Sequence, residues 1–129
     1  MTASIATNQT ILVVGGGISG MTAALEAAEC GKQVILVEKT PVLGGRTARL
    51  YRYFPKMCHP TCGLEINLRR IKQNRNIRLM TMTEVTAISG SRGAYAVTLR
   101  MAPRFVNENC TACGKCAEAV TAEIPNPWN

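Results

Sequence analysis

The chain has 129 residues, 47% of them hydrophobic and 18% charged, which is enough for one domain with a packed core and excludes two large domains. No apolar run approaches the ~20 residues that cross a bilayer, so we expect no direct membrane span. The first ten residues are polar and uncharged and lack the regions of a secretory signal, so we expect a cytoplasmic protein.

The formal net charge is +7, and much of the excess lies between Arg46 and Arg78, where nine basic residues stand against the single acid Glu65. Such a segment can attract nucleic acid, an acidic protein or an anionic ligand, or it can be a solvated helix face with phosphate contacts. Few aromatic residues lie among these charges and no recognition motif is present, so we expect no nucleic-acid partner.

The first predicted elements form a βαβ unit. The β-branched, apolar run 11–14 predicts a buried strand of a parallel sheet. Residues 18–30 are mostly good helix formers, and Gly31 is placed to end that helix. The apolar run 33–37 predicts a second buried strand, so strand, helix and strand fit the length of one βαβ unit.

A glycine fingerprint, G-x-G-x-x-G, spans residues 15–20 between the first strand and the helix. We expect Gly15 to allow the tight turn, Gly17 to let the backbone approach a pyrophosphate, and Gly20 to let the helix pack closely on the sheet. The first helical residues, Ile18 and Ser19, then present backbone N–H groups and a partial positive charge to phosphate. The pattern therefore predicts a dinucleotide site.

An acid, Glu38, ends the second strand, eighteen residues after Gly20. A carboxylate at that position can accept hydrogen bonds from the ribose hydroxyls of an adenosine. An NADP site would favour a basic group at this position, and the following Lys39 does not reverse the preference. We assign Glu38 and Lys39 to the cofactor site.

A Gly-Gly-Arg sequence, Gly44-Gly45-Arg46, follows within a loop-rich segment. Two glycines permit close backbone approach to a cofactor, and the arginine supplies charge and donors to phosphate or flavin. Here the sequence resembles the two-dinucleotide-binding-domain flavoproteins, in which a Gly-Gly pair shortly after the ribose acid lines the FAD. The resemblance favours FAD over NAD(P).

The rest of the domain is predicted to hold one helix and several strands. A helix starts near residues 61 and 62, with Leu64, Leu68 and Ile71 facing the core. Strands are expected at 77–82 and 85–89, and a turn at 89–93 leads into a run of alternating apolar residues. We interpret these strands as a β-meander.

Three cysteines with the spacing C-x₂-C-x₂-C, Cys110, Cys113 and Cys116, can wrap three corners of an iron–sulfur cluster. The fourth cysteine and proline of ferredoxin sequences are replaced here by Val120 and Thr121. The fourth ligand would come from Cys58, from Cys62 or from outside this sequence. Zinc, or no metal, are the alternatives.

Cys58 and Cys62 flank a short loop segment that contains His59. The pair could be redox-active, ligate a cluster, or consist of ordinary loop cysteines, and the three interpretations stay open. His59 is expected to be a surface residue. Cys30 stands alone, and we expect it to pack in a helix.

Segments 54–58, 61–67 and 103–110, together with the glycine motifs and the cysteine triplet, resemble the family of the heterodisulfide reductase A subunit and most of all its relative, the A subunit of the quinone-interacting membrane-bound oxidoreductase complex. The resemblance implies an FAD-binding subunit of a multisubunit redox complex with a [4Fe-4S] cluster and a membrane-bound partner subunit. In that relative, electrons pass between membrane quinol and adenylylsulfate reductase, which implies a position at the inner face of the membrane through partners.

The sequence therefore predicts an α/β, Rossmann-like FAD/NAD(P)-binding βαβ domain with a β-meander and a cysteine-rich extension. Residues 10–105 are assigned to the N-terminal part of an FAD-binding domain, and 106–129 to a cluster-binding segment and tail. Family members are several times longer, so we expect an incomplete fold that is inactive in isolation. No evident general acid or base is present, which favours electron relay. The alternatives are a substrate-oxidising flavoenzyme of the amine-oxidase or phytoene-desaturase type, and a truncated module without activity.

Overall fold

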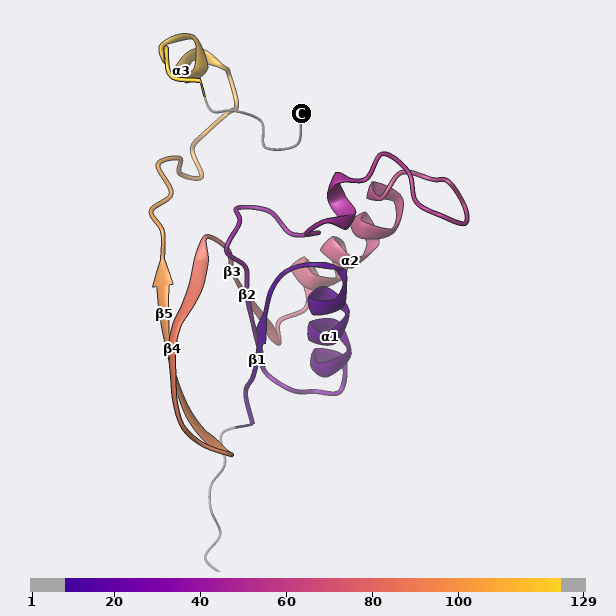
Figure 1. Cartoon of the computed structure of the whole chain (residues 1–129), viewed down its shortest axis with the longest axis vertical. Helices are drawn as coiled ribbons and strands as arrows, with labels where there is room; N and C mark the ends of the chain where they lie inside the picture. The colour runs from indigo at the N-terminus through magenta and orange to yellow at the C-terminus, as the bar shows by residue number, and fades with distance from the viewer. Residues whose placement is uncertain (1–8, 124–129) are drawn as a thin grey trace, which may run out of the picture.

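The structure, a computed structural model, describes residues 9–123; the first eight residues and the Pro-rich tail, 124–129, lie outside the described part. A three-stranded parallel sheet carries two helices, and a separate antiparallel hairpin follows it (Figure 1). The elements are β1 (Ile11–Val14), α1 (Ile18–Glu29), β2 (Val34–Val37), η1 (Thr47–Arg49), α2 (Thr61–Gln73), β3 (Ile77–Met80), β4 (Thr83–Ser91), β5 (Ala94–Met101) and α3 (Lys115–Glu118).

The predicted βαβ unit is confirmed. β1 and β2 pair in parallel, with Ile11 opposite Val34, and β3 adds to the far side of β2. The helix α1 ends just before Gly31, whose φ of +79° is the left-handed conformation that commonly follows a helix. The core lies between α1 and the central strand, where Met21 and Leu36 are fully buried.

The edge strand β1 is more exposed than its apolar sequence predicts. Ile11 and Val14, the two ends of the strand, are 39% and 61% exposed, and β1 is an edge strand with a neighbouring strand on one side only. An apolar run of this kind is typical of strands buried on both faces. The exposure agrees with the prediction of an incomplete α/β fold.

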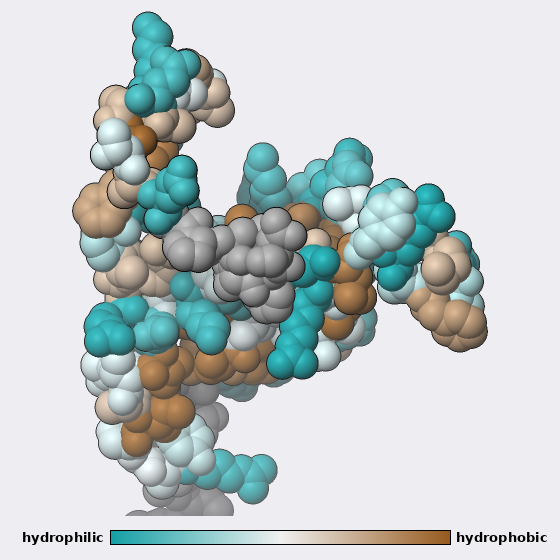
Figure 2. Space-filling view, turned by 45° about the horizontal axis from the view of Figure 1, so that its top comes forward, coloured by the Kyte–Doolittle hydropathy of each residue, from teal (hydrophilic) through white to brown (hydrophobic). Residues whose placement is uncertain are grey.

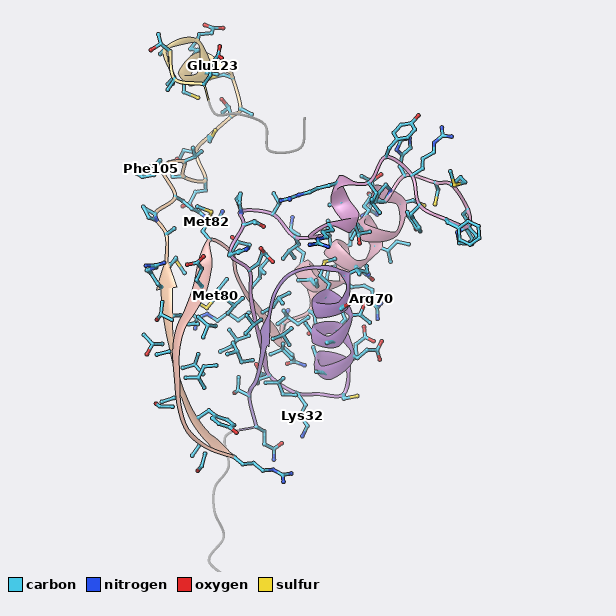
Figure 3. The ribbon with its side chains drawn as sticks, viewed as in Figure 1. Lys32, Arg70, Met80, Met82, Phe105 and Glu123 are labelled. Atoms are coloured by element: carbon cyan, nitrogen blue, oxygen red, sulfur yellow. The ribbon has the colours of Figure 1, made fainter. Side chains whose placement is uncertain are left out.

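The helix α2 packs on α1 through Leu64 and Ile71, which are both buried. The prediction that Leu68 faces the core is wrong, because its side chain is 40% exposed. It lies about 40° around the helix from Leu64, at the rim of the apolar stripe. An ion pair between Arg70 and Glu29, 2.5 Å long, joins the outer surfaces of the two helices (Figure 3).

The antiparallel part is a hairpin of two strands, smaller than the predicted β-meander. The reason is that β3 pairs in parallel with β2 and stops at Met80, since Met82 takes a positive φ of +55° and redirects the chain. β4 and β5 then pair over their whole length, with a β-bulge between Val85 and Ala87.

The hairpin stands on the side of the sheet opposite the helices (Figure 1). No described helix is long and apolar enough to cross a membrane.

An apolar hollow of about 630 Å³ separates the sheet from the hairpin, and hydrophobic surface is in view near the hairpin in Figure 2. The hollow is lined by Thr10, Leu12, Ile35, Ile88, Tyr95, Val97 and Leu99.

Beyond β5 the chain continues as an extended arm, residues 102–123, in which every residue is exposed. The arm is joined to the domain at its root, where Ala102 donates a backbone hydrogen bond to Met82 and the Arg104 side chain donates to Thr81 (Figure 3). The short helix α3 lies at the far end of this arm (Figure 1). The predicted domain boundary between 105 and 106 stays a prediction.

Candidate dinucleotide site and cysteine arm

The three glycines of the fingerprint meet three different geometric requirements. Gly15 has a φ of +102°, which side chains disfavour, and its N–H donates to the carbonyl of Val37 at 2.7 Å. A Cβ on Gly20 would lie 1.9 Å from the carbonyl oxygen of Gly15, so only glycine allows α1 to pack there. A Cβ on Gly17 would meet no protein atom within 4 Å, which leaves open space above this residue.

The structure brings the Gly-Gly pair beside the fingerprint, although Gly16 and Gly44 are 28 positions apart in the sequence. The N–H of Gly44 donates to the carbonyl of Gly16 at 2.8 Å, and Gly44 forms a parallel bridge with Gly17. A Cβ on Gly45 would lie 3.1 Å from the Cα of Gly17. The two loops therefore lie in direct backbone contact, and Gly45 is the glycine whose added Cβ would crowd the fingerprint.

Glu38 is 8% exposed, and its carboxylate is held by three donors. The N–H of Gly16 donates to Oε2 at 2.5 Å, and the N–H and hydroxyl of Thr40 both donate to Oε1 at 2.8 Å. Burial opposes ionisation, but the bonds from Thr40 and Gly16 outweigh it and hold the pKa of Glu38 below its ordinary value. Glu38 is therefore an ionised, oriented acceptor at neutral pH.

Gly16 and Thr40 were not among the predicted site residues. A Cβ on Gly16 would lie 2.2 Å from Leu43 Cδ2 and 3.1 Å from Glu38, so a larger residue at this position would need both side chains to shift. The third consecutive glycine in the sequence was the available signal. For Thr40 the sequence gives no signal, since its role depends on where the loop after β2 turns.

Two hollows lie on either side of Glu38. One of about 470 Å³ is bounded by the end of β1 and the start of β4, and another of about 380 Å³ is bounded by the Gly45–Arg46 loop. Glu38 and Lys39 line both hollows, and Arg46 lines the second. The acid thus stands between two spaces that are open to a ligand.

The N-terminus of α1 carries no side-chain cap and no acidic residue in its first turn. The backbone N–H groups of Ile18 and Ser19 lie in that first turn, whose N–H groups have no partner within the helix. A helix terminus of this kind favours an anion. The uncapped N-terminus, the open space over Gly17 and the ionised Glu38 together fit a dinucleotide.

The cysteine triplet lies in the exposed arm. The N–H of Ala112 donates to Cys110 Sγ at 3.4 Å. The N–H of Lys115 and the hydroxyl of Thr111 lower the pKa of Cys113 below its ordinary value. These donors suit a thiolate ligand, but no three Cys, His, Asp or Glu side chains of residues 9–123 converge on a point that could hold a metal ion.

The other cysteines are also exposed or half-buried. Cys62 lies in the first turn of α2, and Cys58 lies in the loop before this helix; α2 and that loop lie on the side of the molecule away from the arm (Figure 1). The structure therefore does not bring this pair beside the triplet. The pKa of Tyr53 is raised above its ordinary value, first by its hydrogen bond with Cys58. Cys30 follows the end of α1 and is exposed, so the prediction that it packs in a helix is wrong.

Comparison with known proteins gives the family. The sequence model described as FAD dependent oxidoreductase matches residues 10–70, which contain both glycine motifs and Glu38. The chain is 42% identical over 119 residues to an iron-sulfur A subunit of CoB–CoM heterodisulfide reductase from Methanopyrus kandleri, and 39% identical over 126 residues to the corresponding A subunit from Methanocaldococcus jannaschii. The chain belongs to the heterodisulfide reductase A-subunit family.

The matching model is that of FAD dependent oxidoreductases and the relatives are named as reductase subunits, so the predicted family, oxidoreductase class and FAD cofactor are confirmed. The two matches cover 92% and 95% of this chain but only 18% and 19% of those proteins. The chain thus spans about a fifth of the length of the curated relatives that it matches.

A solved structure supports the fold. Histamine dehydrogenase from Rhizobium sp. 4-9 is 33% identical, with a TM-score of 0.51, over 64% of this chain and 12% of that one. The chain therefore shares its α/β architecture with part of a solved dehydrogenase.

Proposed function

We propose that this chain is the FAD-binding portion of an electron-transfer subunit in a multisubunit redox complex. The observation that carries the proposal is the junction of the two glycine loops, which leaves open space over Gly17 next to the ionised Glu38. A ligand with both a pyrophosphate and a ribose matches that combination. FAD, when bound, supplies the electron chemistry, and the chain supplies binding and orientation.

Each site residue has one proposed role toward FAD. The backbone of residues 15–20, with the N–H groups of Ile18 and Ser19 in the first turn of α1, binds the pyrophosphate. Glu38 accepts hydrogen bonds from the ribose. Gly44 and Gly45 lack side chains and so leave room beside the fingerprint for the flavin side of the cofactor. Lys39 and Arg46 provide positive charge.

The cysteine arm is proposed to contribute Cys110, Cys113 and Cys116 to a [4Fe-4S] cluster. The support is the C-x₂-C-x₂-C spacing, the hydrogen-bond donors to two of the sulfurs, and the name of the Methanopyrus kandleri relative, which is an iron-sulfur subunit. Because the structure does not bring Cys58 or Cys62 beside the triplet, the fourth ligand is proposed to come from residues outside this chain.

The partners are proposed to be other subunits of the complex, one of them bound to the membrane. This proposal extends to electron flow between membrane quinol and adenylylsulfate reductase, at the inner face of the membrane. It rests on the sequence resemblance to the quinone-linked A subunit, and on relatives that are named as subunits of heterodisulfide reductases.

A second candidate is a substrate-oxidising flavoenzyme, and the similarity to histamine dehydrogenase favours it. Both candidates need FAD, so flavin content does not separate them. Iron does, because the electron-transfer proposal requires the cysteine triplet to ligate a cluster. Iron that is present in the wild-type chain and lost after Cys113→Ser supports the first candidate; an iron-free, flavin-loaded chain supports the second.

The test of FAD binding uses Gly17. Alanine at Gly17 meets no protein atom within 4 Å, so the Gly17→Ala variant is expected to fold, while its methyl group enters the proposed pyrophosphate space. We expect FAD affinity in a fluorescence titration to fall by roughly 10-fold or more, since overpacking costs about 1–3 kcal/mol. The control is Gly63→Ala on α2, where the added methyl group makes an ordinary 3.4 Å contact. Equal affinity of both variants and wild type would contradict the proposal.

A further inference from the structure

The backbone of Thr40 makes two hydrogen bonds, one on each side of the residue. Its N–H donates to Glu38 Oε1 at 2.8 Å, and its carbonyl accepts the N–H of Met82 at 3.2 Å. These two bonds fix the residue on both sides. The side-chain hydroxyl makes contacts of its own in addition to these two.

The Thr40 hydroxyl has two acceptors within reach. Its oxygen lies 2.8 Å from Glu38 Oε1 and 2.8 Å from the carbonyl oxygen of Val42. A hydroxyl carries a single hydrogen, so it satisfies one of these acceptors at a time. A bond to a carboxylate is roughly twice as strong as one to a neutral carbonyl, so Glu38 is the preferred acceptor.

The carboxylate of Glu38 has little capacity left for a ligand. A carboxylate offers about four acceptor positions. The N–H of Gly16 and the N–H and hydroxyl of Thr40 occupy three of them. A ribose presents two neighbouring hydroxyls as donors. One of the three protein donors must leave for both of them to bind, and the hydroxyl is the donor with an alternative acceptor.

We propose that the Thr40 hydroxyl is a placeholder for a ribose hydroxyl. It satisfies Glu38 while the site holds no nucleotide, and it turns to the Val42 carbonyl when the ribose donates to Oε1. The inference rests on the proposed function, since it takes Glu38 as the ribose acceptor. Thr40 is then a positioning residue that acts through Glu38, because its hydroxyl competes with a ribose hydroxyl for Oε1. The strength of this competing bond lowers the affinity for the nucleotide.

The test compares FAD affinity across substitutions at Thr40. Thr40→Val keeps the shape and the backbone N–H but lacks the hydroxyl. It loses a strong bond in the free state and a weaker one in the bound state, so we expect FAD to bind about fivefold more tightly. Thr40→Ser keeps the hydroxyl and is expected to bind as wild type does. Thr86→Val on β4, which removes an exposed hydroxyl bonded to Thr98, is the matched control.

A second readout is chemical unfolding without FAD, in which Thr40→Val is expected to be less stable than the Thr86→Val control. Thr40→Ala serves if the valine variant does not fold. If wild type binds FAD but the Thr40→Val or Thr40→Ala variant binds it equally or more weakly, the placeholder is overturned and the FAD site stands. A wild-type chain that binds no FAD overturns the proposed function and this inference with it.

Discussion

The nucleotide half of the chain and the cysteine arm carry their chemical groups in opposite ways. Around Glu38, hydrogen bonds donated by backbone N–H groups join Gly16 to Glu38, 22 positions apart, and Gly44 to Gly16, 28 positions apart. Glu38 is buried, and the two glycine loops are in direct contact. Beyond Arg104, the bonds that hold the arm join residues two to four positions apart, and every side chain is exposed. The nucleotide half is preorganised by long-range contacts. The described part of the arm carries cysteines that could bind a metal, but they do not converge on one point.

This difference has a physical consequence for the two cofactors. A preorganised site binds its ligand without first ordering the chain, so the affinity is set by the contacts between the ligand and the site. A metal site that lacks convergent ligands gains its order when the metal binds, so ligand binding and folding of the loop are coupled. We therefore expect substitutions to affect stability in the nucleotide half and to affect metal content, with little change in stability, in the arm.

The largest contrast is expected between two glycines. Gly20→Val places its Cβ 1.9 Å from the carbonyl oxygen of Gly15, a clash with backbone that cannot be relieved cheaply. We expect a loss of about 4 kcal/mol or more in unfolding free energy, or no folded protein. Gly114→Ala in the arm meets no atom within 4 Å, and only its positive φ costs stability, about 1 kcal/mol. Urea unfolding monitored by circular dichroism measures both, and similar losses would remove the contrast.

A smaller contrast is expected between two apolar residues. Leu36, on the central strand, is fully buried, so Leu36→Ala should cost about 2–5 kcal/mol through lost burial and a cavity. Val120 in the arm is 59% exposed, so Val120→Ala should stay within about 0.5 kcal/mol of wild type. The same unfolding measurement checks the pair. A clear loss for Val120→Ala would show that the arm packs on the domain in solution.

The Glu38 carboxylate should make the stability of the nucleotide half depend on pH. Its folded pKa is lowered, so its contribution is complete above the unfolded pKa of about 4.3 and is lost as pH falls through the lower folded value. In Glu38→Gln, an amide N–H₂ group faces the donors of Gly16 or Thr40 and cannot accept their hydrogen bonds. The free energy of unfolding should therefore fall by about 1–3 kcal/mol at pH 7. The difference in stability between wild type and variant, measured from pH 7 to pH 3, should shrink. A constant difference would contradict the assignment.

The smallest effect on stability is expected for the cysteines of the arm. Replacement of Cys113 by serine removes an exposed side chain, so the unfolding free energy should change by less than about 0.5 kcal/mol. Iron content after anaerobic reconstitution should fall to background, while FAD affinity is unchanged. Cys30→Ser, another exposed cysteine, is the control and should retain iron. Loss of both iron and FAD in the Cys113 variant would show that the two regions are coupled.

The sequence was sufficient for the parts of the fold whose signals are local. The strand, glycine turn, helix and acid lie consecutively between residues 11 and 38, so their order and spacing predict the βαβ unit. The separate roles of Gly15 and Gly20 followed from the same pattern, and their φ and packing match it. The helix α2 was placed correctly, because its apolar spacing and the break after Gln73 are both visible in the sequence.

The misplaced parts depend on contacts between distant residues. A β-meander was expected from successive strand-like runs, but whether 77–80 pairs with β2 or with its sequence neighbour is decided by the parallel sheet and by the turn at Met82. The exposure of Leu68 and Val14 depends on which elements cover them. Likewise, the bond of Gly16 to Glu38 exists only because the glycine turn meets the end of β2, 22 positions along the chain.

The most direct test of the account is a backbone-amide NMR titration of the isotope-labelled chain with FAD. We predict that the amide resonances of residues 15–20 and 38–46 shift with a common saturable dependence on FAD, Gly16 and Thr40 included, while those of the arm stay unchanged. Absence of shifts in these two segments at saturating FAD, or shifts confined to the arm, would contradict the claim that the joined glycine loops and Glu38 form the FAD site.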